Sequence, residues 1–395
     1  MLTSCQTQTK SFTVDLITTP LCTNGDTSTY PYTLVLDETE FFTPPQTLSP
    51  SLAKASIVLS SSAYKCDSVH KNLEALGFEH KAKFNYSDDY DENAVGIAIA
   101  SRKIEDTTVV AVVFRGTFAK EWYSNFDIGK SVNVTKVHEG FSKANEFAHK
   151  KLDMYMANYA VDKDHCKFLI TGHSRGAAVA NLFAKDLIDT YSKENVYAYT
   201  FATPNTTTNE TATSDKYSGI FNFVNPEDFI AYIPLESWGF TKYGTTITFF
   251  TAETDPLYEE KLQKVKQKYL EYRKRDFITY NGEEKKNEFL SSANELAPTI
   301  KDYYDTKYEI AGLKMSVYEY MTMFAHVLNE ENIISNGLIF LGSDDTEFEV
   351  LKNYIMLGMD NPDASMSFDY SNSLISYSHP AETYLCFLEV YLEYL

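Results

Sequence analysis

The stretch FLITGHSRGAAVANLFAKDL, residues 168–187, runs from an apolar segment through a glycine-flanked serine into an alanine-rich segment. The apolar segment predicts a short buried strand, and the alanine-rich segment predicts a helix that packs close to a sheet. Ser174, between Gly172 and Gly176, falls at the turn between them and fits the pattern Gly-x-Ser-x-Gly. Such a turn presents a serine hydroxyl as a nucleophile; the alternative is an ordinary strand-to-helix turn.

The segments around this stretch predict an α/β fold. β-Branched and apolar runs predict strands, and amphipathic runs predict helices, in alternation along the chain. This alternation favours a mostly parallel sheet flanked by helices on both faces. The predicted strands are residues 95–100, 107–114, 166–171, 196–202 and 220–224, and the predicted helices are 138–159, 175–191 and 381–395.

The pattern changes in the second half of the chain. Residues 254–345 are highly charged, with Leu262, Val265 and Tyr269 at helical spacing. We interpret them as an inserted helical segment that could form a cap, and residues 1–253 and 346–395 as the sheet-containing core. The locally basic run 261–275 suggests either contact with anionic lipid head groups or a solvated helix face.

Composition excludes some partners. The 395 residues contain 35 Lys and Arg against 55 Asp and Glu, a net charge of −20, which argues against nucleic acid. No apolar run is long enough for a transmembrane segment. The first residues lack the basic and apolar regions of a signal peptide. We therefore expect a cytoplasmic protein, the alternative being a secreted one whose leader has been removed.

A nucleophilic serine needs a base and an acid, and chain order limits the candidates. On a sheet of this type the order is serine, then Asp or Glu, then histidine. Beyond the strand ending near residue 224 only His326 and His379 remain. His326 lies inside an apolar run that predicts a helix, whereas His379 lies on a predicted loop before the last helix. We therefore favour His379.

The acid is expected just after the strand at 220–224. Asp228 follows it in NPED, where functional groups gather at the carboxyl ends of strands. Glu227 is adjacent and Asp215 lies upstream of the strand. The same composition also fits a turn or a helix N-cap, so Asp228 is the favoured acid but has a structural alternative.

The developing negative charge of an acyl-transfer reaction needs hydrogen-bond donors. The backbone N–H of Arg175, next to the serine, is one candidate. A second is expected after an earlier strand, where Arg115, Gly116 and Thr117 follow the run at 107–114. By themselves these three residues fit a solvent-exposed turn equally well.

Taken together, these segments resemble the class 3 lipases, the fungal-type triacylglycerol lipases and their bacterial relatives within the α/β-hydrolase fold. The resemblance covers residues 95–244 and 377–385, and suggests a bacterial-type member. It rests on the order of VVFRGT, VHEGF, ITGHSRGAAVANL, VNPEDFIAYIP with WGFTKYG, and SHPAETYL.

The resemblance implies site residues. Ser174, Asp228 and His379 would be nucleophile, acid and base, and Thr117 and Arg175 the oxyanion donors. Residues 118–137 would occupy the position of the mobile lid. The candidates for substrate binding are then Trp122 and Phe126, for which core packing is the alternative, and His173.

The expected function is a serine carboxylic-ester hydrolase, a lipase or esterase acting on lipid-like acyl esters with no metal or organic cofactor. Its partners would be the acyl-ester substrate and, transiently, a lipid interface. The alternatives are a short-chain, phospholipid or feruloyl-type esterase, and a catalytically inactive lipid-binding protein. Arg175 stands where fungal members commonly have leucine, and the segment between Asp228 and His379 is longer than in the minimal fungal enzymes.

Overall fold

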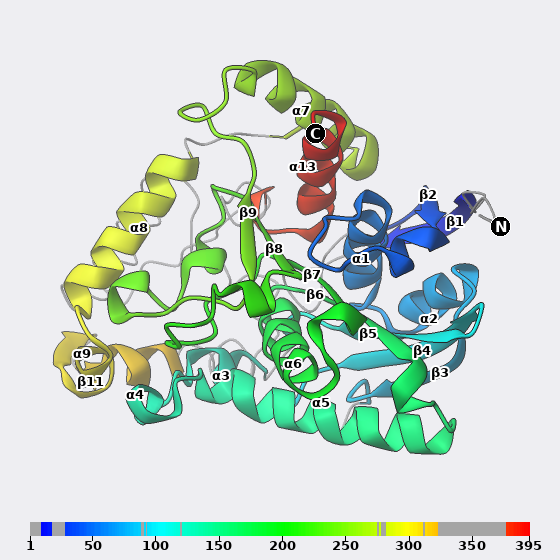
Figure 1. Cartoon of the computed structure of the whole chain (residues 1–395). Coiled ribbons are helices and arrows are strands. Elements are labelled where there is room, and N and C mark those ends of the chain that lie inside the picture. Colours follow the sequence, from blue (N-terminus) through cyan, green and yellow to red (C-terminus); the bar gives the residue numbers. More distant parts are fainter. Residues whose placement is uncertain are drawn as a thin grey trace.

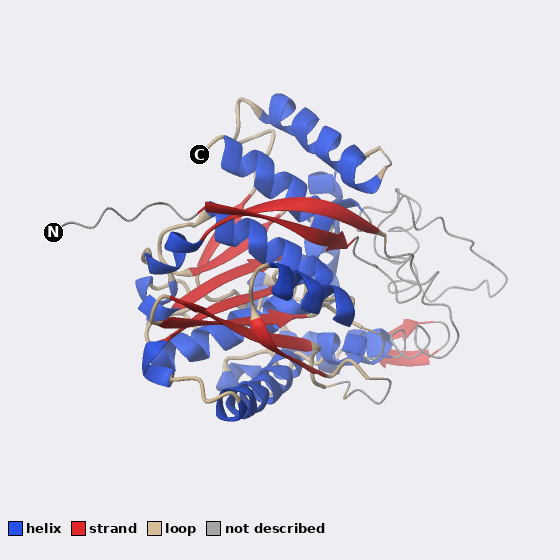
Figure 2. Cartoon of the chain, turned by 90° about the vertical axis from the view of Figure 1, so that its right-hand side faces the viewer, coloured by secondary structure: helices blue, strands red, loops and turns tan. Residues whose placement is uncertain are grey.

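A computed structural model describes residues 9–17, 28–87, 91, 93–118, 121–274, 276–277, 282–310, 313–322 and 377–395 of the chain. His326 and the predicted boundary at residue 346 lie outside these ranges. Figures 1 and 2 show a central sheet with helices on either side. No helix among the described residues combines the length and apolarity that crossing a membrane demands.

The central sheet has seven strands, which lie side by side in the order of the sequence. The pairs β3–β4 and β4–β5 are antiparallel, and every pair from β5 to β9 is parallel. The sheet is therefore mixed but mostly parallel, as predicted. The strands are β3 (Glu79–Phe84), β4 (Ile97–Ile104), β5 (Thr107–Phe114), β6 (Cys166–His173), β7 (Val196–Phe201), β8 (Ile220–Val224) and β9 (Thr245–Thr248).

Side chains alternate between the two faces of the sheet, and each face has its own core. Along β5, Val110 and Val112 pack with α5 (Glu139–Asn158) and α6 (Arg175–Tyr191). Ala111 and Val113 of the same strand face the opposite core. The period of two along a strand puts consecutive residues on opposite faces, so both faces are apolar and both are covered.

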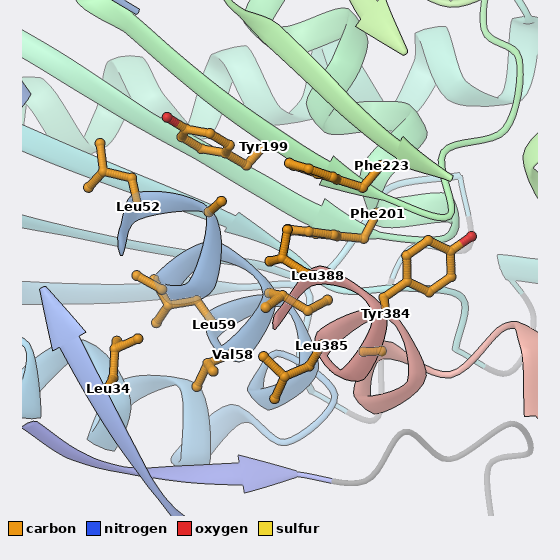
Figure 3. Close-up of a cluster of buried hydrophobic side chains, with 14 of the residues drawn as sticks. Leu34, Leu52, Val58, Leu59, Tyr199, Phe201, Phe223, Tyr384, Leu385 and Leu388 are labelled. Carbon is orange, nitrogen blue, oxygen red and sulfur yellow. The ribbon is translucent and has the colours of Figure 1, made fainter. Parts of the chain in front are cut away.

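The second core contains helices from both ends of the chain. These are α1 (Pro50–Ser62), α2 (Cys66–Ala75) and α13 (Ala381–Glu393). Figure 3 shows Leu388 of α13 beside the ring of Phe201 from the sheet, and Leu59 of α1 belongs to the same cluster. The hairpin of β1 (Thr9–Ile17) and β2 (Thr29–Asp37) contributes to the same core. This arrangement confirms the α/β-hydrolase architecture that the sequence predicts.

The described part of the predicted insertion contains α7 (Tyr258–Arg273), α8 (Gly282–Leu296), α9 (Ile300–Asp305) and a hairpin of β10 (Lys307–Ile310) and β11 (Leu313–Ser316). The remaining short helical elements lie within the loops around the sheet. They are η1 (Glu38–Phe42), α3 (Trp122–Phe126), α4 (Val132–Thr135), η3 (Lys163–His165), η4 (Lys193–Asn195), η5 (Asp215–Tyr217), η6 (Phe229–Tyr232) and η7 (Glu236–Trp238).

Helix α7 packs against α13, and its basic residues pair with acidic residues of that helix. Lys268 lies 3.1 Å from Glu389, and Arg273 lies 2.8 Å from the buried Glu382. The basic run therefore forms ion pairs within the chain, an arrangement that neither sequence interpretation included. Contact of this run with lipid stays a prediction.

Candidate active site

Ser174 sits at a sharp turn between β6 and α6. Its backbone has φ +58° and ψ −129°, a conformation that side-chain-bearing residues rarely adopt. Two glycines allow the turn: a Cβ at Gly172 would overlap the backbone of Gly176, and a Cβ at Gly176 would lie 2.5 Å from the carbonyl oxygen of Arg115. The first turn of α6 thus lies directly against the end of β5.

Three predicted residues come together at this turn. His379 Nε2 lies 2.9 Å from Ser174 Oγ, and His379 Nδ1 lies 2.8 Å from Asp228 Oδ2. An ionised carboxylate can only accept, so the imidazole proton is on Nδ1 and Nε2 is free to accept from the serine hydroxyl. Asp228 is fully buried, whereas Ser174 and His379 keep 8% and 6% of their surface exposed.

Asp228 is also an N-cap. Its Oδ1 accepts a hydrogen bond from the Ile230 N–H at 3.1 Å at the start of η6. Its Oδ2 accepts a second bond, at 2.7 Å, from the hydroxyl of Tyr384 in α13. One carboxylate oxygen of Asp228 therefore caps the turn, and the other faces His379.

The alternative acids lie elsewhere. Asp215 is on the surface, 2.8 Å from Lys193. Glu227 lies against the first turn of α8, since a Cβ at Gly282 would be 2.5 Å from its carboxylate. Burial, and next the charge of Glu283, raise the pKa of Glu227 to about 7. The other candidate base, His326, is outside the described residues.

His173 lies beneath the site and does not line the pocket next to Ser174. Its Nε2–H donates to the carbonyl of His379 at 2.7 Å, and its Nδ1 accepts from the Tyr64 hydroxyl at 2.9 Å. Burial, with the nearby His379, lowers the pKa of His173 well below its usual value, so it is neutral. At its position in β6 the His173 side chain points into the core. There it supports the backbone of His379 through this hydrogen bond.

The two predicted donor groups adjoin the serine. Arg175 is the first residue of α6, where a helix has no internal partner for the backbone N–H. Thr117 follows β5, and its Oγ1 accepts from Asn125 Nδ2 at 3.0 Å. The hydrogen of the Thr117 hydroxyl is not used in this bond and can be donated to another acceptor. Gly116 allows close packing, since a Cβ there would overlap the Tyr64 hydroxyl.

The side chain of Arg175 is buried and holds the loop that carries Asn125. Its guanidinium donates to Asn125 Oδ1 at 3.2 Å and to the Ala94 carbonyl at 2.9 Å. Burial lowers the pKa of Arg175 to about 10, against the opposing effect of Glu121, so it is charged at neutral pH. The charged side chain of Arg175, which stands where fungal members commonly have leucine, therefore holds the loop that carries Asn125.

Further buried groups hold the same loop. Arg115 pairs with Glu121 at 2.8 Å, and the other carboxylate oxygen of Glu121 accepts from the Phe118 N–H at 2.8 Å. His138, from VHEGF, caps α5 through the Phe141 N–H, and its Nε2–H donates to the Asn125 carbonyl at 3.2 Å. Sequence reasoning missed these roles; the charged Arg115 directly after an apolar strand and the position of His138 before a helix were the available signals.

A pocket of about 180 Å³ opens beside Ser174 and is lined almost entirely by apolar side chains. Trp122 and Phe126 line it, and their rings stack with centroids 6.3 Å apart. Thr117, Asn125 and Arg175 border it near the serine. The remaining wall comes from the loop after Asp228 and from the insertion.

Sequence comparison finds a family similarity in this part of the chain. The family model described as lipase (class 3) matches residues 111–238, which include Ser174, Asp228, Thr117 and Arg175 but not His379. No curated protein sequence matches the chain.

Several solved structures are similar to it. A triacylglycerol lipase whose catalytic centre is described as a serine protease triad is 20% identical; the match covers 52% of this chain and 83% of that one, with a TM-score of 0.41. The Rhizomucor miehei triacylglyceride lipase is 20% identical over 51% and 80%, with a TM-score of 0.37. The mono- and diacylglycerol lipase from Aspergillus oryzae is 18% identical over 52% and 81%, with a TM-score of 0.40.

The sheet, the serine at its strand-to-helix turn and the family match make the protein an ester hydrolase. Within that class, residues 111–238 are similar to the class 3 lipases, as the match to that family model indicates. The prediction of a bacterial-type member finds no support in these matches.

Proposed function

We propose that the protein is a serine hydrolase that cleaves lipid-like acyl esters through an acyl-enzyme on Ser174. The observation that carries this proposal is the 2.9 Å approach of Ser174 Oγ to His379 Nε2 beside an apolar pocket. His379 is in turn 2.8 Å from the buried Asp228. A hydroxyl, a base and an orienting carboxylate in this order are what acyl transfer requires.

In the first half-reaction Ser174 Oγ attacks the ester carbonyl, and its proton passes to His379 Nε2. The N–H groups of Arg175 and Thr117, with the Thr117 hydroxyl, donate to the oxyanion. Collapse of the intermediate breaks the ester C–O bond, and His379 gives its proton to the leaving alcohol. Asp228 stabilises the imidazolium throughout.

In the second half-reaction water attacks the acyl-serine while His379 accepts its proton. The oxyanion forms at the same donors and collapses to release the carboxylic acid, and the proton returns to Ser174 Oγ. The apolar pocket accommodates the acyl chain, which supports lipid-like esters over small polar ones. No step requires a metal or an organic cofactor.

Labelling with a fluorophosphonate probe, together with ester hydrolysis, tests the proposal. Ser174→Ala should abolish labelling, and Ser174→Ala and His379→Ala should each lower kcat by several orders of magnitude, up to roughly 10⁶. His165→Ala is the control, since His165 is exposed and paired with Asp162 on the surface. Full esterase activity in Ser174→Ala would refute the proposal.

Two alternatives give different results in the same experiment. A catalytically inactive lipid-binding protein would not be labelled by the probe. A phospholipid or feruloyl-type esterase would be labelled but would prefer phospholipid or feruloyl esters over simple acyl esters at equal concentration.

A further inference from the structure

We infer that helix α8 sets the acyl-chain length that this protein accepts, and that its substrates are esters of medium-chain acids with about six to eight carbons. The inference rests on the proposed function and specifies its substrate class. It is carried by the residues of α8 that line the pocket, by the contacts that fix α8, and by the size and polarity of the pocket.

One face of α8 forms a wall of the pocket. Phe289, Ser292, Ala293 and Leu296 all line it. Their spacing of three, four and seven residues puts them on a single side of the helix. The middle of this face consists of two small side chains, Ser292 and Ala293, so the pocket extends toward the helix between the larger Phe289 and Leu296. The neighbouring Ser291 is exposed and does not line the pocket.

Helix α8 is fixed to the loop that follows Asp228. The rings of Phe289 and Phe229 have centroids 4.5 Å apart, and Leu296 is buried in the same cluster. The indole N–H of Trp238 donates to the Ala297 carbonyl at 2.7 Å, and Ser237 Oγ donates to Asn294 Oδ1 at 2.7 Å. The pocket-facing part of α8 is therefore in contact with the loop that follows Asp228 at both of its ends.

Another part of the wall comes from the region of the predicted lid. Trp122, Phe126 and Ile128 line the pocket there, and Ile128 packs with Ala297 just after α8. Ser174, α3 and α8 all border this space, so an acyl group attached to the serine hydroxyl would lie against both helices. Bulk added on α8 must shorten the space open to that chain.

The size of the pocket sets the chain length. An apolar protein cavity of about 150 Å³ holds one benzene ring, six carbons. By that measure the 180 Å³ beside Ser174 corresponds to roughly seven carbons. The side chains that line the pocket away from the serine are mostly apolar. Each methylene of the substrate that is buried there should raise kcat/KM about fourfold, when its burial stabilises the transition state. Shorter chains leave the pocket part-filled, and longer chains exceed it.

Hydrolysis of p-nitrophenyl esters from C2 to C16 tests this inference, with rates normalised to active sites titrated by the fluorophosphonate probe. For the wild type, kcat/KM should peak at C6 to C8. Ser292→Phe should lower the C8:C2 ratio of kcat/KM at least tenfold, and Phe289→Ala should move the peak to longer chains. Ser291→Phe makes the same change one position away on the exposed side and should keep the wild-type profile.

The outcomes separate this inference from the proposed function. A labelled, active wild type with its peak at C2 to C4 or at C12 and beyond would overturn the inference alone. So would identical profiles for Ser292→Phe and Ser291→Phe. A wild type that is neither labelled nor active on any ester would overturn the proposed function and the inference with it.

Discussion

The Tyr384 hydroxyl donates a hydrogen bond to Asp228 Oδ2 at 2.7 Å, the same oxygen that His379 Nδ1 contacts at 2.8 Å. The Asn225 N–H donates to the Tyr384 oxygen at 3.1 Å, so a short chain of hydrogen bonds ends on the proposed acid. Burial and the charge of Asp228 raise the pKa of Tyr384 well above its usual value, which keeps it a donor at every working pH.

Tyr384→Phe should therefore lower the rate of hydrolysis. The substitution removes one of the hydrogen bonds that hold the Asp228 carboxylate in place beside His379. We expect kcat at neutral pH to fall roughly three- to tenfold, which steady-state kinetics on one ester measures. Tyr391→Phe, a half-buried tyrosine of the same helix, is the control; an unchanged kcat in Tyr384→Phe would contradict the prediction.

Asn125→Leu should lower kcat with little change in KM. Asn125 accepts from Arg175 and donates to Thr117 Oγ1, so its loss leaves the Thr117 hydroxyl free to rotate away from the oxyanion. Because an oxyanion donor acts mainly in the transition state, we expect a loss of roughly 10- to 100-fold in kcat. Steady-state kinetics on one ester measures this, with the exposed Asn158→Leu in α5 as control. An equal rise in KM with kcat preserved would show that Asn125 acts in substrate binding instead.

Gly176→Ala should destabilise the fold and reduce activity. The added Cβ would lie 2.6 Å and 2.5 Å from the carbonyl oxygens of Phe114 and Arg115, where only backbone movement can make room. We expect about 2–3 kcal/mol less free energy of unfolding in urea. Gly239→Ala is a matched comparison, because its Cβ would have no neighbour within 4 Å and only its φ of +83° is unfavourable, about 1 kcal/mol. Equal losses in the two variants would rule out the steric explanation.

Glu227→Gln should flatten the pH dependence of stability. The folded-state pKa of Glu227, about 7, lies above the ordinary value of 4.5. The folded protein therefore holds this proton more tightly than the unfolded chain. The resulting stabilisation is complete below pH 4.5 and is lost as the pH rises through 7.

Urea unfolding at pH 5 and pH 8 measures this effect. Between the two pH values, the free energy of unfolding of the wild type should fall by about 1–3 kcal/mol more than that of Glu227→Gln. A tenfold change in proton affinity corresponds to about 1.4 kcal/mol, and the effect is reduced because Glu227 keeps some contact with solvent. The exposed Glu253→Gln should behave as the wild type does. A variant that retains the wild-type pH dependence would mean that Glu227 is ionised in the folded protein.

The predicted elements that the structure reproduces are those with strong local patterns. The strands β5, β6, β7 and β8 and the helices α5, α6 and α13 lie where apolar periodicity puts them. Ser316 and Glu319 form a capping box of the kind that sequence spacing marks, with reciprocal bonds of 2.9 Å and 3.2 Å. In the central sheet, the two strands that were not predicted are those at its edges: β3 reads EHKAKF and β9 reads TTIT, and neither has a buried residue. Edge strands need no continuous apolar run, so periodicity does not mark them.

The sequence by itself determined the α/β class, the serine at its strand-to-helix turn, and the preference for Asp228 and His379, because local patterns and chain order carry that information. Only the tertiary structure decided which groups complete the site. Tyr384 meets Asp228 across 156 residues of chain, and Asn125 meets Arg175 across 50. Likewise α8 and Ser174, more than a hundred residues apart in the chain, line the same pocket. Such contacts depend on how the sheet and its helices pack, and packing leaves no periodic signal in either partner.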